Sequence, residues 1–140
     1  MEGLLSPATV PLAIAIGERC GKGRKPDQEW DSVQLGLAVS YLAAGRRDDA
    51  LGALGRSFVV GRRDGAPLYW CDGEALQDSV ACRTWVLRRI IAAQPLAAAE
   101  RAQLLVVVRP ALIDDAFAAA LGVARTALPA DPQAKDANDF

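Results

Sequence analysis

Apolar and polar residues follow one another along residues 27–61 at the three- and four-residue steps of two consecutive amphipathic helices. Asp27 is placed to cap the first helix, and Gly45 stands where a left-handed residue would end it. Asp48 then opens the second helix, where the helix dipole favours a negative charge. The pattern therefore predicts a helical hairpin. Its inward stripes are Trp30, Val33, Leu37, Tyr41 and Ala44 on the first helix and Leu51, Leu54 and Phe58 on the second.

Further helices are predicted on both sides of this hairpin by the same spacing and by favourable first-turn residues. Their expected ranges are about 11–19, 72–91, 95–108 and 111–128. Proline at position 110 separates the last two, since it cannot continue a helix. We therefore expect an all-α protein, a compact bundle of about five helices that forms a single domain over residues 1–128. Residues 129–140 are polar, acidic and proline-containing, and we expect a disordered tail.

Two features of the hairpin's second half qualify this picture. The segments Ser57–Val60 and Leu68–Cys71 flank an Asp-Gly pair, which is a turn signal, so a short β-hairpin near residues 57–71 is an alternative to helix and loop. Gly52 and Gly55 each cost roughly 1 kcal/mol against alanine inside a helix. We expect close approach of a neighbouring helix to compensate for them.

Small and large residues in the hairpin stand at the spacings of a known repeat unit: Leu37, Ala38, Tyr41, Gly45, Ala50, Leu54 and Ser57. Residues 34–61 thus resemble one tetratricopeptide-like helical hairpin. Gln34 replaces a usual aromatic and Arg62 a usual proline, and no second unit follows at the ~34-residue period of that family. The resemblance implies helix–turn–helix geometry and, as in the family, binding of a peptide or partner protein in a groove.

Composition narrows the class of protein. The chain is 51% apolar and 24% charged, with a net charge of −1, which argues against a dedicated DNA coat or a polybasic membrane binder. Richness in alanine, with arginine far above lysine, suggests a bacterial or phage source. The three cysteines form no CxxC pair, so we expect reduced thiols and a cytoplasmic location. No apolar run approaches the ~18 residues of a membrane span, so no membrane partner is expected.

Residues for catalysis are sparse. The chain has no histidine, which removes the commonest general base and the usual imidazole metal ligands. Its three cysteines have no zinc-finger spacing. Residues 17–23 depart from a phosphate-binding loop in glycine spacing and in lacking a hydroxyl after the lysine. Asp114 and Asp115 are read as helix N-terminal carboxylates. We therefore expect no enzyme, cofactor or metal; a reactive Cys71 thiol ranks last among the hypotheses.

The predicted function is a non-catalytic helical protein-interaction module, such as an adaptor, a chaperone-like factor or an inhibitor. A homodimer is a variant of it, because helices that are apolar on more than one face need cover. The alternative is a helical nucleic-acid-associated subunit of a larger bacterial or phage assembly that uses arginine pairs. Arginine and aromatic side chains are the preferred anchors of such contacts. The candidate partner-binding residues are Arg46, Arg47, Arg62, Arg63, Tyr69 and Trp70.

Overall fold

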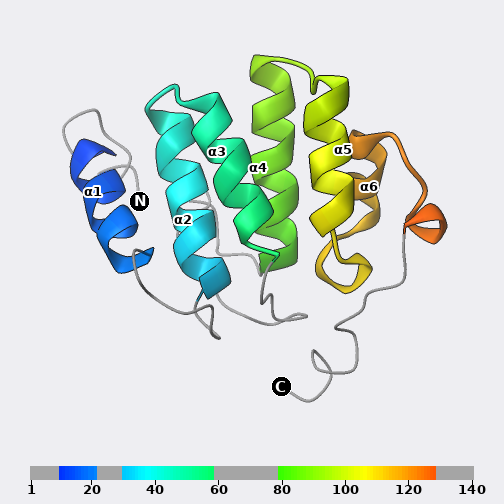
Figure 1. Ribbon diagram of the computed structural model, residues 1–140, viewed down its shortest axis with the longest axis horizontal. Helices are drawn as coiled ribbons and strands as arrows, with labels where there is room; N and C mark the ends of the chain where they lie inside the picture. Colours follow the sequence, from blue (N-terminus) through cyan, green and yellow to red (C-terminus); the bar gives the residue numbers. More distant parts are fainter. Residues whose placement is uncertain (1–9, 22–29, 59–78, 129–140) are drawn as a thin grey trace.

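The computed structural model describes residues 10–21, 30–58 and 79–128, and within these ranges every regular element is a helix (Figure 1). The all-α prediction is thereby confirmed. The α-helices are α1 (Val10–Gly21), α2 (Trp30–Ala43), α3 (Arg47–Arg56), α4 (Ser79–Ala93), α5 (Ala98–Val107) and α6 (Asp115–Leu121). Two short 3-10 helices follow α5 and α6: η2 (Pro110–Leu112) and η3 (Arg125–Ala127).

The helices pack in a row that begins with α1 and ends with α5 and α6 (Figure 1). Helix α2 packs against α1, α3 and α4, and α4 also packs against α3 and α6. In the view of Figure 1, α3 and α5 lie towards the reader, with α4 between them. The bundle thus presents α3 and α5 on one face. Every described α-helix contributes buried side chains to the core, and α2 and α4 contribute the most.

The predicted hairpin is present as α2 and α3. Gly45 adopts the left-handed conformation, with φ at +74°, and its N–H donates to the Leu42 carbonyl at 3.1 Å. The N–H of Arg46 donates to the Tyr41 carbonyl at 2.8 Å. These two bonds are those of a Schellman motif, which satisfies the last carbonyls of α2 and reverses the chain. The predicted end of the first helix is therefore confirmed.

The core joins the end of α3 to α4 and α6. Phe58 meets Phe117 edge to face, with ring centroids 5.9 Å apart. Arg83 of α4 lies against the Phe58 ring and is fully buried. Its Nε donates to Ser57 Oγ at 3.1 Å, its Nη2 donates to the Ser57 carbonyl at 2.8 Å, and its guanidinium lies 4.9 Å from the centre of the Phe58 ring. A buried cation is costly unless it is bonded in this way, so Arg83 fixes α3 on α4.

Helix α1 is held against α2 by close packing and one polar bond. A Cβ added at Gly17 would lie 2.7 Å from Leu37 Cδ2, so the backbone of α1 rests directly on that side chain. The Tyr41 hydroxyl donates to Glu18 Oε2 at 2.7 Å. Burial, reinforced by the Glu18 bond, raises the pKa of Tyr41 to about 12. Gly17 therefore lies inside a helix and allows α1 to pack closely on α2.

Two expectations about local structure need correction. Helix α3 ends at Arg56, and Ser57 and Phe58 continue it as a helical turn, so a β-hairpin near residues 57–71 is not supported; its remainder lies outside the described residues. The last helix ends at Leu121 rather than 128, because Gly122 adopts φ of +79° and turns the chain into η3. The six α-helices in the described ranges correspond to the six helical ranges expected, in a bundle predicted to have about five.

Cys82 departs from the expectation of reduced thiols, because it is disulfide-bonded. Its side chain is buried within α4. Such bonds are rare in reducing compartments, and the cytoplasmic location stays a prediction. The expected tail at residues 129–140 lies outside the described residues.

Asp114 has the structural role expected of it. Its Oδ1 accepts from the N–H of Phe117 at 2.8 Å, which caps α6. The same oxygen accepts from Thr84 Oγ1 at 2.7 Å, and this bond fastens the start of α6 to α4. The carboxylate is therefore engaged in capping and packing.

Candidate functional site

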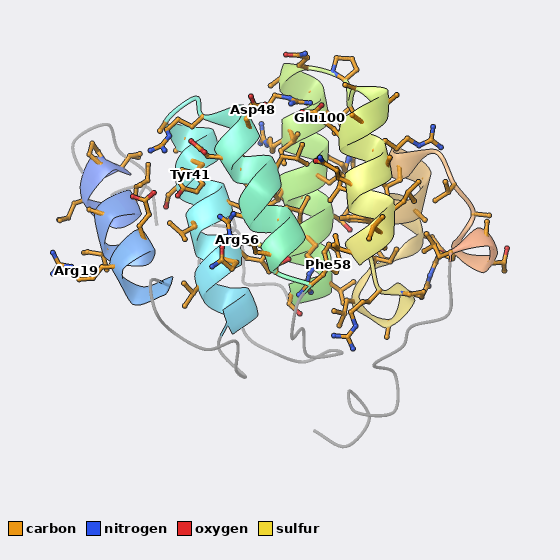
Figure 2. All side chains as sticks on the ribbon, in the orientation of Figure 1. Arg19, Tyr41, Asp48, Arg56, Phe58 and Glu100 are labelled. Carbon is orange, nitrogen blue, oxygen red and sulfur yellow. The ribbon has the colours of Figure 1, made fainter. Side chains whose placement is uncertain are left out.

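A groove of about 440 Å³ runs between α3 and α5. Figure 2 shows its orientation: Asp48 and Glu100 lie at the end where both helices begin, and Arg56 lies near the other end. Both helices run in the same direction along it, and each is 10 residues long, or about 15 Å. Its walls are Asp48, Leu51, Gly52, Gly55 and Arg56 from α3 and Glu100, Gln103, Leu104 and Val107 from α5.

The two glycines of α3 face this groove, and this corrects the expectation of close helix packing. A Cβ added at Gly55 would meet nothing within 4 Å. A Cβ added at Gly52 would meet only Arg56 Nη1, the far end of a long side chain, at 3.3 Å. Glycine at each position lowers helix stability by roughly 1 kcal/mol against alanine. No neighbouring helix among the described residues packs closely enough to require glycine at these positions. Gly52 and Gly55 therefore form an open notch on α3.

Apolar side chains flank this notch. Leu51 is half-buried, Leu104 is buried, and Val107 is 37% exposed at the open edge of α5. The preceding residue, Val106, is 84% exposed. Adjacent exposed valines at the end of a helix leave apolar area in water that the fold itself does not cover.

Arg47 lies at the start of α3 and is bonded to Glu100, a residue that lines the groove. Its Nη1 donates to Glu100 Oε2 at 2.8 Å and its Nη2 to Glu100 Oε1 at 3.1 Å, a bidentate pair between α3 and α5. Nη2 also donates to the carbonyls of Gln94 and Pro95, at 2.9 and 3.3 Å. Arg47 therefore sets the distance between α3 and the loop that leads into α5.

Negative charge exceeds positive charge at this end of the groove. The Arg47 bond, with a further bond from the Ala97 N–H, lowers the pKa of Glu100 to about 2, so this carboxyl is ionised at neutral pH. Arg47 Nη1 also lies 3.1 Å from Asp48 Oδ1, and the Asp48 side chain is 90% exposed. One guanidinium thus serves two carboxylates, which leaves a net negative charge beside the groove.

The predicted partner-binding residues fall into two groups. Arg46 and Arg47 are described, and both make contacts within the chain: Arg46 Nε lies 2.7 Å from Asp49 Oδ2, and its guanidinium lies 4.7 Å from the centre of the Tyr41 ring. Their role in partner binding stays a prediction. The other four, Arg62, Arg63, Tyr69 and Trp70, lie outside the described residues.

The residues of α5 that line the groove were not predicted from the sequence. Leu104 and Val107 belong to a helix whose apolar residues point in several directions, so periodicity alone does not reveal which are exposed. The adjacent valines at 106 and 107 were the available signal, because both cannot face one core at helical spacing. Gly52 and Gly55 were noticed but were assigned to packing.

Within the described ranges, no group of three or more His, Cys, Asp or Glu side chains is placed to hold a metal ion. No described helix is long and apolar enough to cross a membrane. Comparison with protein-family models, with curated proteins and with solved structures found no match.

Proposed function

We propose that this chain is a non-catalytic helical interaction module, and that the groove between α3 and α5 is where it binds a partner protein. The observation that carries the proposal is the open notch at Gly52 and Gly55. Two glycines weaken a 10-residue helix, and their missing side chains admit contact with the α3 backbone.

The flanking side chains fit the same role. Leu51, Leu104 and Val107 provide apolar contact area, and the lining also includes the polar side chains of Asp48, Arg56, Glu100 and Gln103. Protein-binding surfaces usually combine apolar contact area with polar groups of this kind. The single tetratricopeptide-like unit expected at residues 34–61 agrees with this class of function, although the groove proposed here also needs α5.

The experiment is paired capture from the native host on immobilised wild-type and variant protein. Gly55→Trp fills the notch, and Ala119→Trp places the same side chain on an exposed position of α6 outside the groove. We expect at least one protein that wild type and Ala119→Trp retain and Gly55→Trp loses. If the two variants retain the same proteins, the groove is not the binding surface.

Nuclease treatment of parallel samples tests the nucleic-acid alternative. Arg46 and Arg47 each lie beside a carboxylate, which lowers their attraction for phosphate, so the described part of the chain favours a protein partner. Retention that nuclease abolishes, and that weakens steeply with salt, would instead support the nucleic-acid-associated subunit.

A further inference from the structure

We infer that the occupant of the groove is a short amphipathic helix of the partner, which lies antiparallel to α3 with a basic residue in its last turn beside Asp48. This inference rests on the proposed function and adds the secondary structure, the direction and the charge of the bound segment. The backbone, the shape and the charges of the groove each support this inference.

The backbone of the walls excludes strand pairing. Both walls are α-helices, whose internal N–H and C=O groups already bond to each other. An extended segment would bring its own N–H and C=O groups against Leu51, Leu104 and Val107, where they would find few partners and lose water. A helix satisfies its backbone internally, so it can lie on this apolar surface without that penalty.

The shape of the groove suits one helix face. The α3 wall recedes at positions 52 and 55, which are three residues apart and therefore lie on the same side of the helix. Small residues at such spacing allow two helix axes to approach closely, and the apolar side chains on either side then pack against the incoming helix. The length of the walls, about 15 Å, accommodates about 10 residues of the partner, close to three turns.

The charges of the groove set the direction. The net negative charge of Arg47, Asp48 and Glu100 lies where α3 and α5 begin, and it favours a cation on the partner. A helix most readily carries a cation in its last turn, because its dipole is negative there. If the last turn of the partner helix lies where α3 and α5 begin, the partner runs antiparallel to both. This arrangement also places the C-terminal end of the partner helix beside the N-terminal ends of α3 and α5.

The test uses a displayed library of 14-residue peptides on a helix-favouring alanine and glutamine background. Positions i, i+3, i+4 and i+7 of one face are randomised, together with two positions in the first turn and two in the last. The full chain is the target, and Gly55→Trp is the counter-target. We expect enriched peptides with apolar residues on the randomised face and Lys or Arg in the last turn.

Affinity measurements on one enriched peptide then test the site. We expect its Kd to rise at least tenfold with Gly55→Trp and to stay unchanged with Ala119→Trp. With Asp48→Lys we expect the preference at the last turn to change from basic to acidic. A spin label on the last turn of the peptide should broaden the amide resonances near Asp48 more than those near Arg56.

Several results would overturn the inference. These are no enrichment beyond the counter-target, enrichment of acidic last turns with wild type, or broadening near Arg56 instead of Asp48. Light scattering that shows a wild-type dimer and a Gly55→Trp monomer would identify a second copy as the occupant, which also overturns it. If capture still gives a groove-dependent native partner while no helical peptide is enriched, the proposed function stands and only the helical partner fails.

Discussion

Gly17 of α1 lies so close to Leu37 of α2 that a Cβ on Gly17 would stand 2.7 Å from Leu37 Cδ2. Leu37 is buried, so its side chain has little room to move away. The close packing of α1 on α2 therefore explains why position 17 of α1 is a glycine. The glycines of α3 have no such contact, and the difference can be measured.

Gly17→Ala is expected to destabilise the protein. Overpacking of a core contact costs about 1–3 kcal/mol, which exceeds the gain of roughly 1 kcal/mol in helix propensity. We expect a net loss of about 1 kcal/mol in the free energy of unfolding, measured by urea denaturation with circular dichroism at 222 nm. An increase in stability would mean that α1 does not rest on Leu37 in solution.

Gly55→Ala is expected to have the opposite effect. Its Cβ enters open space, so only helix propensity changes, and we expect a gain of about 1 kcal/mol in the same measurement. Gly52→Ala should gain slightly less, since Arg56 Nη1 must shift from 3.3 Å. A loss of stability at Gly55 would show a close neighbour and would remove the main support for the groove.

Much of the fold could be predicted from the sequence, because local signals decide it. The left-handed Gly45 and the Asp114 cap act through neighbouring residues, and each is present as predicted. Of the stripe expected on α2, Leu37 and Tyr41 are buried and Val33 is partly buried, whereas Ala44 is exposed. The end of α6 was missed at Gly122: the apolar spacing continues past it, and a glycine inside such a pattern does not reveal its φ.

The groove could not be predicted, because it depends on which side of α3 remains uncovered. In the sequence, Gly52 and Gly55 are equally consistent with close packing against a neighbouring helix and with an open notch. Only the position of α5 in the fold distinguishes the two arrangements. Arg47 was expected on a binding surface. Its bond to Glu100 joins residues 53 positions apart, and no local pattern indicates such a pair.

The buried Arg83 is expected to stabilise the core. Arg83→Ala removes the buried donors to Ser57 and leaves a cavity beside Phe58, so we expect a loss of about 3 kcal/mol. Arg83→Met keeps most of the volume without a buried charge and should lose less. Thermal melting of both variants checks this order; an equal or larger loss in Arg83→Met would mean that the polar bonds, rather than the filled volume, dominate.

The ion pair between Arg47 and Glu100 should make the stability of the fold depend on pH. Its pKa falls from the ordinary 4.5 to about 2 in the folded chain, so the Arg47–Glu100 pair stabilises the fold above pH 4.5 and loses this effect as the pH falls through 2. Wild type should therefore melt at a higher temperature than Glu100→Gln at pH 7, and the two melting temperatures should converge between pH 4.5 and 2. A difference that is independent of pH would contradict the ionised pair.

The disulfide bond of Cys82 should make the stability of the fold depend on redox state. Reduction should destabilise the fold by about 2–4 kcal/mol, the usual range for loss of a disulfide. In the unfolded, unreduced protein Cys82 should resist alkylation, and it should react after treatment with a reductant, as peptide mass spectrometry can show. Alkylation of Cys82 without reductant would instead support the reduced thiols expected from the sequence.

The central claim is that a partner protein lies over the notch of α3, and site-specific photo-crosslinking in the native host tests it most directly. A photoreactive amino acid at Gln103 places the probe in the groove, and the same probe at Ala119 on α6 serves as the control. We predict a nuclease-resistant adduct with a protein from position 103 and none from position 119. Equal adducts from both positions, or none from position 103, would contradict the claim.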